Sequence, residues 1–158
     1  MPRGARITLG NACYHIITRG NQKQRVFLES KDYTRYLEIL RKCKTRYKFN
    51  IYAFCLMLNH VHLLIQVKEP EKLVKIMRSL NLKYTLYFNA KYEKIGHLWQ
   101  DRYKSKIIEK DAYLLECANY IETNPIRTSL ISNIADYPWS SYTFRNKNCG
   151  LVDSVFEF

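Results

Sequence analysis

The sequence has no long apolar run and no closely spaced pair of cysteines. None of its stretches approaches the roughly 18 apolar residues of a membrane-spanning helix, and its N-terminal stretch lacks the apolar segment of a secretory signal. We therefore expect a cytoplasmic protein with no membrane partner. The five cysteines are odd in number and far apart, and three lie in apolar stretches. This favours reduced thiols used as small core residues over disulfides or a zinc cage.

Two kinds of catalytic motif are also missing. The chain has no GxxxxGK[ST] or GxGxxG loop, so a motor driven by nucleotide hydrolysis is not expected. No paired-carboxylate motif of a two-metal nuclease stands out. Acidic residues are scarce, because 14 Asp and Glu stand against 26 Lys and Arg, for a net charge of +12. A positive field of this size favours a polyanion, either nucleic acid or an anionic membrane.

The abundant residues narrow that choice. Thirteen tyrosines are present, many of them between lysines and arginines. Aromatic rings stack on unpaired bases while cations meet phosphates, so the combination favours nucleic acid, although a basic surface over an aromatic core would give the same composition. Apolar residues make up 47% of the 158 residues, enough for one compact core. We expect a single domain over residues 1–145 and leave residues 146–158 unassigned.

The spacing of apolar residues predicts an α+β fold. Alternation and turn residues indicate strands at residues 13–19, 50–57, 60–67 and 102–108, with the second and third joined as a hairpin. Helical spacing indicates helices at residues 31–47, with Ser30 as the N-cap, and at 71–92 and 111–124. This order matches a ferredoxin-like, RRM-like split βαβ antiparallel sheet with two helices on one face, followed by an additional C-terminal helix.

The third predicted strand carries the first candidate site. His60 and His62 alternate with apolar residues, so both point to the face that the two helices leave open. Neutral imidazole is a good ligand of divalent metals. His-x-His alone is weak evidence, because a pair of solvated or hydrogen-bonded histidines has the same pattern.

Tyr120 and Asn124 form the second candidate. They lie four residues apart in the predicted third helix and so stand on one face, one turn apart. Leu114, Ala118 and Ile121 form the neighbouring apolar stripe that would seat this helix on the domain. Tyr120 could also be a packed aromatic, and Asn124, which precedes a proline, could cap the following turn.

A basic segment forms the third candidate. Arg102, Lys104 and Lys106 alternate along the fourth predicted strand, which would place them on one face as a row that binds phosphates. A solvated edge strand that lysines protect against aggregation has the same pattern.

In this context the sequence resembles the single-tyrosine HUH transposases. His60-Val61-His62 is similar to their histidine–hydrophobic–histidine motif, and Tyr120 and Asn124 match their nucleophilic tyrosine and the polar metal ligand four residues later. Further stretches resemble the REP-associated branch: Tyr14-His15, Arg19-Gly20-Asn21, Leu98-Trp99-Gln100, Arg102-Tyr103, Tyr120-Ile121-Glu122, Asn124-Pro125-Ile126-Arg127 and Tyr137-Pro138-Trp139-Ser140-Ser141-Tyr142. The resemblance runs from about residue 8 to residue 143. The chain departs from the family at Leu58, where proline is frequent, and at Asn124, where the insertion-sequence branch has glutamine.

The resemblance implies an enzyme that cuts and rejoins single-stranded or hairpin-bearing DNA without ATP. Tyr120 would attack the backbone and become joined to the 5′ side, while His60, His62 and Asn124 would hold a divalent metal, Mg²⁺ or Mn²⁺. The cations implied in DNA binding are Arg19, Arg102, Lys104, Lys106 and Arg127. Insertion-sequence relatives pair two active sites in a dimer and REP-associated ones need not, so a homodimer stays open.

Three other interpretations remain. A non-catalytic RRM-like domain would bind nucleic acid through aromatic and basic residues alone, but an RNP1-type stretch is absent. A domesticated family member would cut hairpins without mobilising them. A zinc hydrolase would use the two histidines, but neither an HExxH motif nor a clear third His or Cys ligand supports it.

Overall fold

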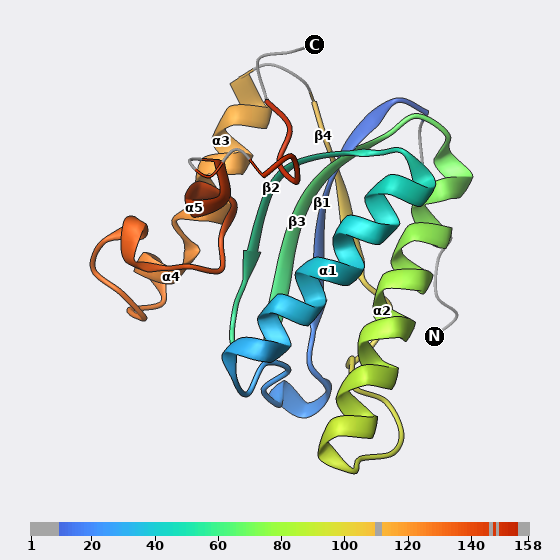
Figure 1. Ribbon diagram of the computed structural model, residues 1–158. Coiled ribbons are helices and arrows are strands. Elements are labelled where there is room, and N and C mark those ends of the chain that lie inside the picture. Colours follow the sequence, from blue (N-terminus) through green and yellow to red (C-terminus); the bar gives the residue numbers. More distant parts are fainter. Residues whose placement is uncertain (1–9, 110–111, 146, 148, 155–158) are drawn as a thin grey trace.

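The computed structural model describes residues 10–109, 112–145, 147 and 149–154. Its main elements follow the order β1, α1, β2, β3, α2, β4, α3 (Figure 1). Their bounds are β1 Ala12–Arg19, α1 Ser30–Tyr47, β2 Asn50–Leu56, β3 His60–Val67, α2 Pro70–Tyr92, β4 Lys104–Ile108 and α3 Ala112–Glu122. The shorter helices are η1 Asn21–Lys23, α4 Asn124–Arg127, η2 Ile134–Asp136 and α5 Ser141–Arg145. The order predicted from the sequence is confirmed.

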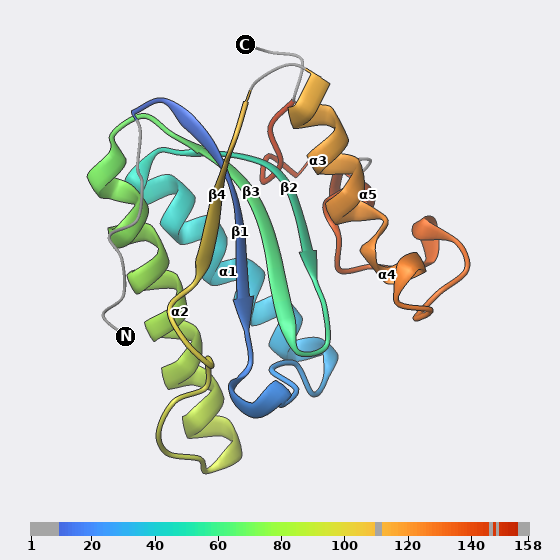
Figure 2. The same ribbon diagram turned by 180° about the vertical axis from the view of Figure 1, so that it is seen from behind.

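The four strands form one antiparallel sheet in the order β2-β3-β1-β4. Helices α1 and α2 cover one face of this sheet (Figure 1), and α3 lies toward the other face, beside β2 (Figure 2). The predicted ferredoxin-like arrangement with an additional helix is therefore confirmed. Among the helices of the described residues, none is long and apolar enough to cross a membrane.

The sheet separates a large core from a small one. The face under α1 and α2 carries the apolar positions of β3, as the alternation predicted, and they join a continuous core with the buried faces of both helices. The small core lies under α3, where Leu114, Ala118 and Ile121 pack against Ala53 and Leu64 of the sheet. The predicted apolar stripe therefore does seat α3 on the domain.

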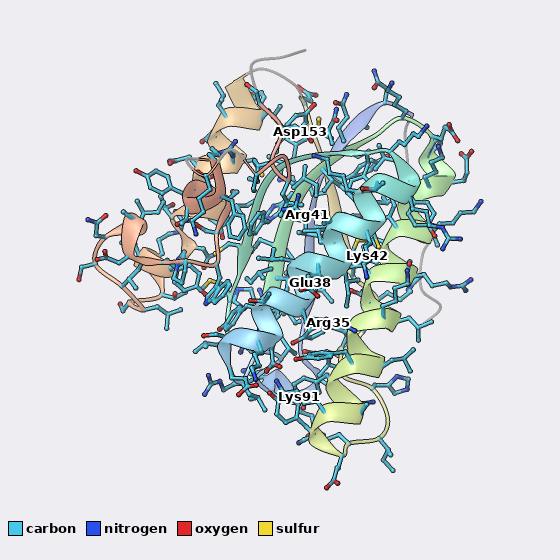
Figure 3. The ribbon with its side chains drawn as sticks, viewed as in Figure 1. Arg35, Glu38, Arg41, Lys42, Lys91 and Asp153 are labelled. Carbon is cyan, nitrogen blue, oxygen red and sulfur yellow. The ribbon has the colours of Figure 1, made fainter. Side chains whose placement is uncertain are left out.

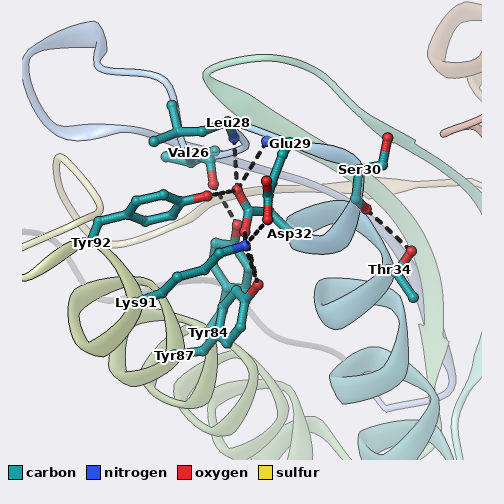
Figure 4. A network of polar contacts seen from close by, with 10 residues as sticks. All are labelled: Val26, Leu28, Glu29, Ser30, Asp32, Thr34, Tyr84, Tyr87, Lys91 and Tyr92. Atoms are coloured by element: carbon teal, nitrogen blue, oxygen red, sulfur yellow. Dashed lines mark hydrogen bonds and ion pairs between the residues drawn. The ribbon is translucent and has the colours of Figure 1, made fainter.

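Helix α1 begins one residue away from the predicted cap. Glu29, not Ser30, is the N-cap residue, because its side chain accepts the N3 backbone N–H while Asp32 accepts the backbone N–H of Glu29. Asp32 is fully buried and also binds Tyr87, Lys91 and Tyr92 near the end of α2 (Figure 4). One carboxylate thus starts the first helix and fastens it to the end of the second.

The outer face of α1 is polar. Arg35, Glu38, Arg41 and Lys42 project from it away from the sheet (Figure 3). Arg35 and Glu38 form an ion pair of 3.4 Å with both side chains about half exposed, and such a pair contributes little to stability.

The chain after α5 returns to α1. Leu151 is fully buried in the large core, and Lys44 forms an ion pair of 2.8 Å with Asp153. The backbone N–H of Asp153 donates to the carbonyl of Ile51 at the start of β2. This part of the unassigned segment 146–158 therefore packs on the domain. The five cysteines are free thiols, and Cys13, Cys43 and Cys55 are buried.

Candidate functional site

The two histidines of β3 stand side by side. Asn59 and His60 close the hairpin from β2, and the ring centroids of His60 and His62 are 5.0 Å apart. His60 is partly buried, whereas His62 is only 2% exposed. The expectation that this face is open is therefore wrong at His62, because α3 and the chain after it cover the sheet there.

A hydrogen bond with Asn59 determines which ring nitrogen of His60 carries the proton and which keeps its lone pair. The side-chain oxygen of Asn59 lies 2.7 Å from His60 Nδ1. Because an amide oxygen only accepts, Nδ1 carries the proton in this contact, and Nε2 keeps its lone pair. The Asn59 amide nitrogen in turn donates to the carbonyl of Lys23 at 3.4 Å, which orients the amide.

A third histidine sets the same tautomer on His62. His62 Nε2 lies 3.0 Å from the Nδ2 of Asn124, and an amide nitrogen only donates, so Nε2 accepts there. The remaining nitrogen, Nδ1, then donates to Nε2 of His15 at 3.0 Å. Both histidines of the motif thus keep the lone pair on Nε2. The Asn124 amide lies against the Nε2 atom of His62.

The surroundings keep these rings neutral. Burial lowers the pKa of His62 to about 3, and the nearby His60, His15, Arg19 and Arg127 lower it further in the same direction. Burial followed by Arg19 lowers the pKa of His60 to about 4. Neutral imidazole is the form that binds metals.

Tyr120 lies over this cluster from α3. Its ring centroid is 6.3 Å from that of His62 and 6.2 Å from that of His15, both with the rings edge to face. The side chain is 47% exposed, so it is not one more packed aromatic of the core. The Arg127 guanidinium lies 4.0 Å from the Tyr120 ring centroid and donates to the Tyr120 carbonyl oxygen and to Thr123 Oγ1. Arg127 therefore holds the end of α3 in place.

The predicted third helix is interrupted before Asn124. Helix α3 ends at Glu122, Thr123 is the N-cap of α4, and Asn124 begins that four-residue helix with Pro125. Asn124 thus starts a new turn, as its proline allowed. It still lies over the same histidine as Tyr120, with only 6% of its surface exposed. Residue 111, where the helix was predicted to begin, lies outside the described residues.

The three cations of the predicted basic row, Arg102, Lys104 and Lys106, do not all lie on one face of β4. Residues directly opposite in neighbouring antiparallel strands point to the same face. Lys106 lies opposite His15, and Lys104 lies opposite Ile17, the partner of His62, so both lysines share the histidine face. Arg19 lies opposite His60 and joins them. Arg102 precedes β4, which begins at Lys104, and lines a separate cavity beside α2.

The fold therefore gathers His60, His62, Asn124, Tyr120 and Arg127 in one place, with Arg19, Lys104 and Lys106 on the same face. His15 was not among the predicted site residues. Its position in a strand with alternating residues hinted that it faces the same way as the histidine pair, but only the β1–β3 register brings it to His62.

The arrangement offers two imidazole nitrogens and one amide to a cation. Among the residues that the structure describes, no three His, Cys, Asp or Glu side chains gather as a metal site. Two neutral histidines and an amide oxygen form a mixed nitrogen and oxygen ligand set, which suits several divalent cations. The chemistry of these residues is therefore compatible with a divalent metal.

Comparison with known proteins gives the family from sequence and the fold from structure. The family model described as "Transposase IS200 like" matches residues 8–124. A protein described as a REP-associated tyrosine transposase, from Haemophilus influenzae, is 30% identical over an alignment of 107 residues, and the match covers 61% of this chain and 60% of that protein. The chain thus spans about 60% of the length of that curated relative.

Two solved structures share the fold. One is a REP-associated tyrosine transposase bound to a REP hairpin, with a TM-score of 0.77, 17% identity, and coverage of 97% of this chain and 89% of the other. The second is a Deinococcus radiodurans protein described as a transposase, with a TM-score of 0.52, 19% identity, and coverage of 78% and 95%. At these identities the likeness shows the fold alone.

Proposed function

Because this chain belongs to the IS200-like transposase family, we propose that it cuts and rejoins single-stranded or hairpin-bearing DNA, with Tyr120 as the nucleophile. The observation that carries the proposal is the position of Tyr120 over the pair His15–His62, beside the amide of Asn124. A half-exposed tyrosine over neutral histidines is accessible to a phosphodiester that enters from solvent.

The reaction is an exchange of one phosphodiester for another. The Tyr120 Oη bonds to phosphorus, the bond from phosphorus to the 3′ oxygen breaks, and the proton lost by the phenol is balanced by the proton that the 3′ oxygen takes up. The product is a 5′-phosphotyrosine and a free 3′-hydroxyl. Because the energy of the linkage is kept, a second 3′-hydroxyl reverses the attack and rejoins DNA without ATP. This agrees with a sequence that has no nucleotide-binding loop.

His60, His62 and Asn124 are the residues that would hold a divalent cation, through both Nε2 atoms and the amide oxygen. When bound, Mg²⁺ or Mn²⁺ supplies a Lewis acid that polarises and orients the scissile phosphate. An amide presents its oxygen or its nitrogen from nearly the same place, so Asn124 can exchange the N–H that it now gives to His62 for an oxygen ligand.

His15 and Asn59 act as positioning residues in this proposal. Each accepts the Nδ1 proton of one motif histidine and so leaves Nε2 as the coordinating atom. Such partners of metal-binding histidines fix the tautomer and the ring orientation. Neutral rings bind a cation without first releasing a proton, and burial favours this form of His60 and His62.

Three cations give the DNA backbone a path across the site. All three lie on the histidine face: Arg19 on β1, which is next to β3, and Lys104 and Lys106 on β4 at the edge of the sheet. Phosphate contacts of this kind position a strand without reading its sequence. The catalytic candidates all come from one chain, so the site does not need a second copy to be complete. A homodimer is not required by this proposal.

The sheet face argues against a non-catalytic RRM-like domain. Such domains stack bases on aromatic residues of the two central strands. Here the same face of β1 and β3 carries three histidines, one cation, one amide, one thiol and two aliphatic residues but no Phe, Tyr or Trp: Cys13, His15, Ile17, Arg19, His60, His62, Leu64 and Gln66. This surface favours metal and phosphate binding over base stacking.

The test is a covalent adduct. Labelled hairpin DNA with single-stranded flanks is incubated with the protein and Mn²⁺, then separated on a denaturing gel. We expect a protein–DNA species that resists denaturant, carries only the label 3′ to the cut, disappears with EDTA and is absent for Tyr120→Phe. If the Tyr120→Phe variant still formed the adduct, another residue would be the nucleophile. Cleavage without any adduct would indicate hydrolysis.

A further inference from the structure

The end of α3 carries a buried carboxylate that the proposed chemistry leaves without a role. Glu122 is the last residue of α3, two positions after Tyr120 and two before Asn124, and only 8% of its surface is exposed. Acidic side chains are rarely buried unless they are paired. Glu122 belongs to the stretch Tyr120-Ile121-Glu122, and one of its partners belongs to the stretch 137–142. The sequence analysis singled out both stretches.

Two side chains of α5 hold this carboxylate, and α5 lies beside α3 in both views of the fold (Figures 1 and 2). Ser141 Oγ donates to Glu122 Oε1 at 2.6 Å. The Arg145 guanidinium donates to the same oxygen from Nε at 2.9 Å and from Nη2 at 2.7 Å. Charge-assisted hydrogen bonds of this kind are shorter and stronger than neutral ones. We call Glu122, Ser141 and Arg145 the α3–α5 cluster.

The two members from α5 are also fixed to the backbone of β2. Ser141 Oγ accepts the backbone N–H of Phe54 at 3.0 Å, and Arg145 donates to the carbonyl oxygen of Tyr52. Strand β2 in turn pairs with β3, the strand of the two motif histidines. The α3–α5 cluster therefore ties the end of α3 to the sheet that carries the histidines.

Glu122 leaves α3 on the side away from Tyr120. Residues two positions apart in an α-helix lie about 200° apart around its axis. Tyr120 faces the rings of His15 and His62, whereas Glu122 faces α5. The end of the helix is thus held from two directions, by the α3–α5 cluster behind Tyr120 and by Arg127 beside it.

The chain turns immediately after Glu122. Thr123 is the N-cap of α4, and Asn124 Nδ2 lies 3.0 Å from His62 Nε2. A displacement of Glu122 would therefore move Tyr120 and Asn124 together, relative to the histidines. Catalytic groups need to be held within about 0.5 Å of their productive geometry, and a misplacement of about 1 Å can cost roughly a hundredfold in rate.

We propose that the α3–α5 cluster positions the end of α3 for the transfer of DNA to Tyr120. By holding Glu122, it sets the place of Tyr120 and Asn124 over the histidines. Its members are positioning residues, because they act through these two side chains. The family model matches residues 8–124, so the inference gives Ser141 and Arg145, which lie after that match, a part in the reaction. It rests on the proposed function for the roles of Tyr120 and Asn124.

The first test compares variants of Glu122 in single-turnover adduct formation, with saturating hairpin DNA and Mn²⁺, well below their melting temperatures. Glu122→Leu removes the acceptor of all three hydrogen bonds. We expect its rate to fall about a hundredfold, while Kd for the hairpin stays within about twofold. Glu122→Gln keeps an oxygen that can accept the same hydrogen bonds, so it should recover a large part of that rate.

The matched control is Asp153→Asn. It breaks the ion pair of 2.8 Å between Lys44 and Asp153, whose length and partial exposure resemble those of the pair between Glu122 and Arg145, at 2.7 Å. Its partners join the chain after α5 to α1 and not to α3. We expect Asp153→Asn to lower the melting temperature but to leave the rate of adduct formation unchanged.

A second readout needs neither DNA nor metal. 3-Fluorotyrosine in place of Tyr120 reports the surroundings of the ring by ¹⁹F NMR, because the ring currents of His15 and His62 displace its resonance. We expect Glu122→Leu to move this resonance toward that of free fluorotyrosine and Asp153→Asn to leave it in place. If Glu122→Leu does not fold, Ser141→Ala removes one hydrogen bond and should give the same direction of shift with about a tenfold loss of rate.

A wild-type rate or an unmoved resonance in folded Glu122→Leu would overturn the inference. An equal loss of rate in Asp153→Asn, or a Glu122→Gln protein no faster than Glu122→Leu, would do the same. Failure of the proposed function looks different. If the wild type forms no adduct but the resonance moves in Glu122→Leu, the cluster still positions Tyr120 and only its role as nucleophile is lost. Adduct formation at equal rates in all variants would remove only the cluster.

Discussion

Two buried polar clusters of the molecule differ in how completely they are satisfied. At the start of α1, the carboxylate of Asp32 accepts hydrogen bonds from two backbone N–H groups and from Lys91, Tyr87 and Tyr92 (Figure 4). On the other face of the sheet, His62 has one partner on each ring nitrogen, and both partners are neutral side chains. The first cluster is charged and saturated, and the second is neutral and can exchange a partner.

The pKa values of Asp32 and His62 are both lowered, but the result is a charged carboxylate in one cluster and a neutral ring in the other. Burial alone raises the pKa of Asp32, but the hydrogen bonds from Lys91, Tyr92, Leu28 and Tyr87 outweigh it and lower the pKa to about 2. The carboxylate therefore stays charged and fastens α1 to α2. At His62 burial lowers the pKa and keeps the ring neutral. A saturated charge holds a fold together, whereas a neutral ring with an exchangeable partner can bind a cation.

The largest expected effect comes from breaking the histidine cluster. His62→Gln keeps a polar side chain of similar reach but removes the imidazole lone pair. We expect adduct formation to fall by roughly a hundredfold or more, since even partners of a metal ligand matter by 10- to 100-fold. Calorimetric titration with Mn²⁺ should show the same loss of affinity. Cleavage at the wild-type rate in a folded His62→Gln protein would remove this residue from the site.

Breaking the carboxylate cluster should affect stability and not chemistry. Asp32→Asn removes the buried charge, and a pKa lowered from its usual value near 4 to about 2 corresponds to about 2 to 3 kcal/mol of stability. That contribution is present above about pH 4 and is lost as the pH falls toward 2, so the denaturation midpoints of wild type and variant should converge there.

Cleavage by Asp32→Asn, measured well below its melting temperature, should match the wild type, because the residue lies on the opposite side of the sheet from the histidines. A gap in stability that stays constant down to pH 2 would show that the charge of Asp32 is not what fastens α1 to α2.

A smaller effect tests the role of His15 as a positioning residue. His15→Leu removes the acceptor of the His62 Nδ1 proton, and we expect the affinity for Mn²⁺ to fall about tenfold. His15→Gln supplies an amide oxygen that can accept the same proton, so it should recover part of that loss while the leucine variant does not. Equal Mn²⁺ affinity in all three proteins would mean that His15 only fills space.

The smallest effect concerns the DNA backbone. Replacing Lys104 and Lys106 by glutamine should flatten the log–log dependence of DNA affinity on salt by about 1.4 to 1.8, since each phosphate contact contributes about 0.7 to 0.9. The double variant Arg35→Gln, Lys42→Gln on the outer face of α1 (Figure 3) is the matched control and should leave the slope nearly unchanged. An equal change in both proteins would indicate a diffuse positive field with no defined path.

The local elements could be predicted from the sequence because their patterns are local. Alternation placed His60 and His62 on one face of β3, and helical spacing placed Tyr120 next to an apolar stripe that the structure finds packed on the sheet. The second helix was predicted to within one residue of its start at Pro70.

The positions of His15, Asn124 and Arg102 could not be predicted, because they depend on strand pairing and on where elements begin and end. His15 meets His62 across 47 residues because β1 pairs with β3 in one register, and a shift by one residue would turn His15 to the other face. Asn124 keeps its place over His62 although α3 ends before it, since Thr123 starts a new turn. Arg102 leaves the basic row because β4 begins only at Lys104. No periodicity within a single segment contains this information.

The central claim is that Tyr120 becomes joined to DNA, and mapping the adduct tests it most directly. The covalent complex formed with hairpin DNA and Mn²⁺ is digested with nuclease and protease, and the peptides are sequenced by mass spectrometry. We expect the nucleotide mass on the peptide that contains Tyr120, attached at Tyr120 through a 5′-phosphate. A nucleotide on any other tyrosine, or at a histidine of the cluster, would contradict the account.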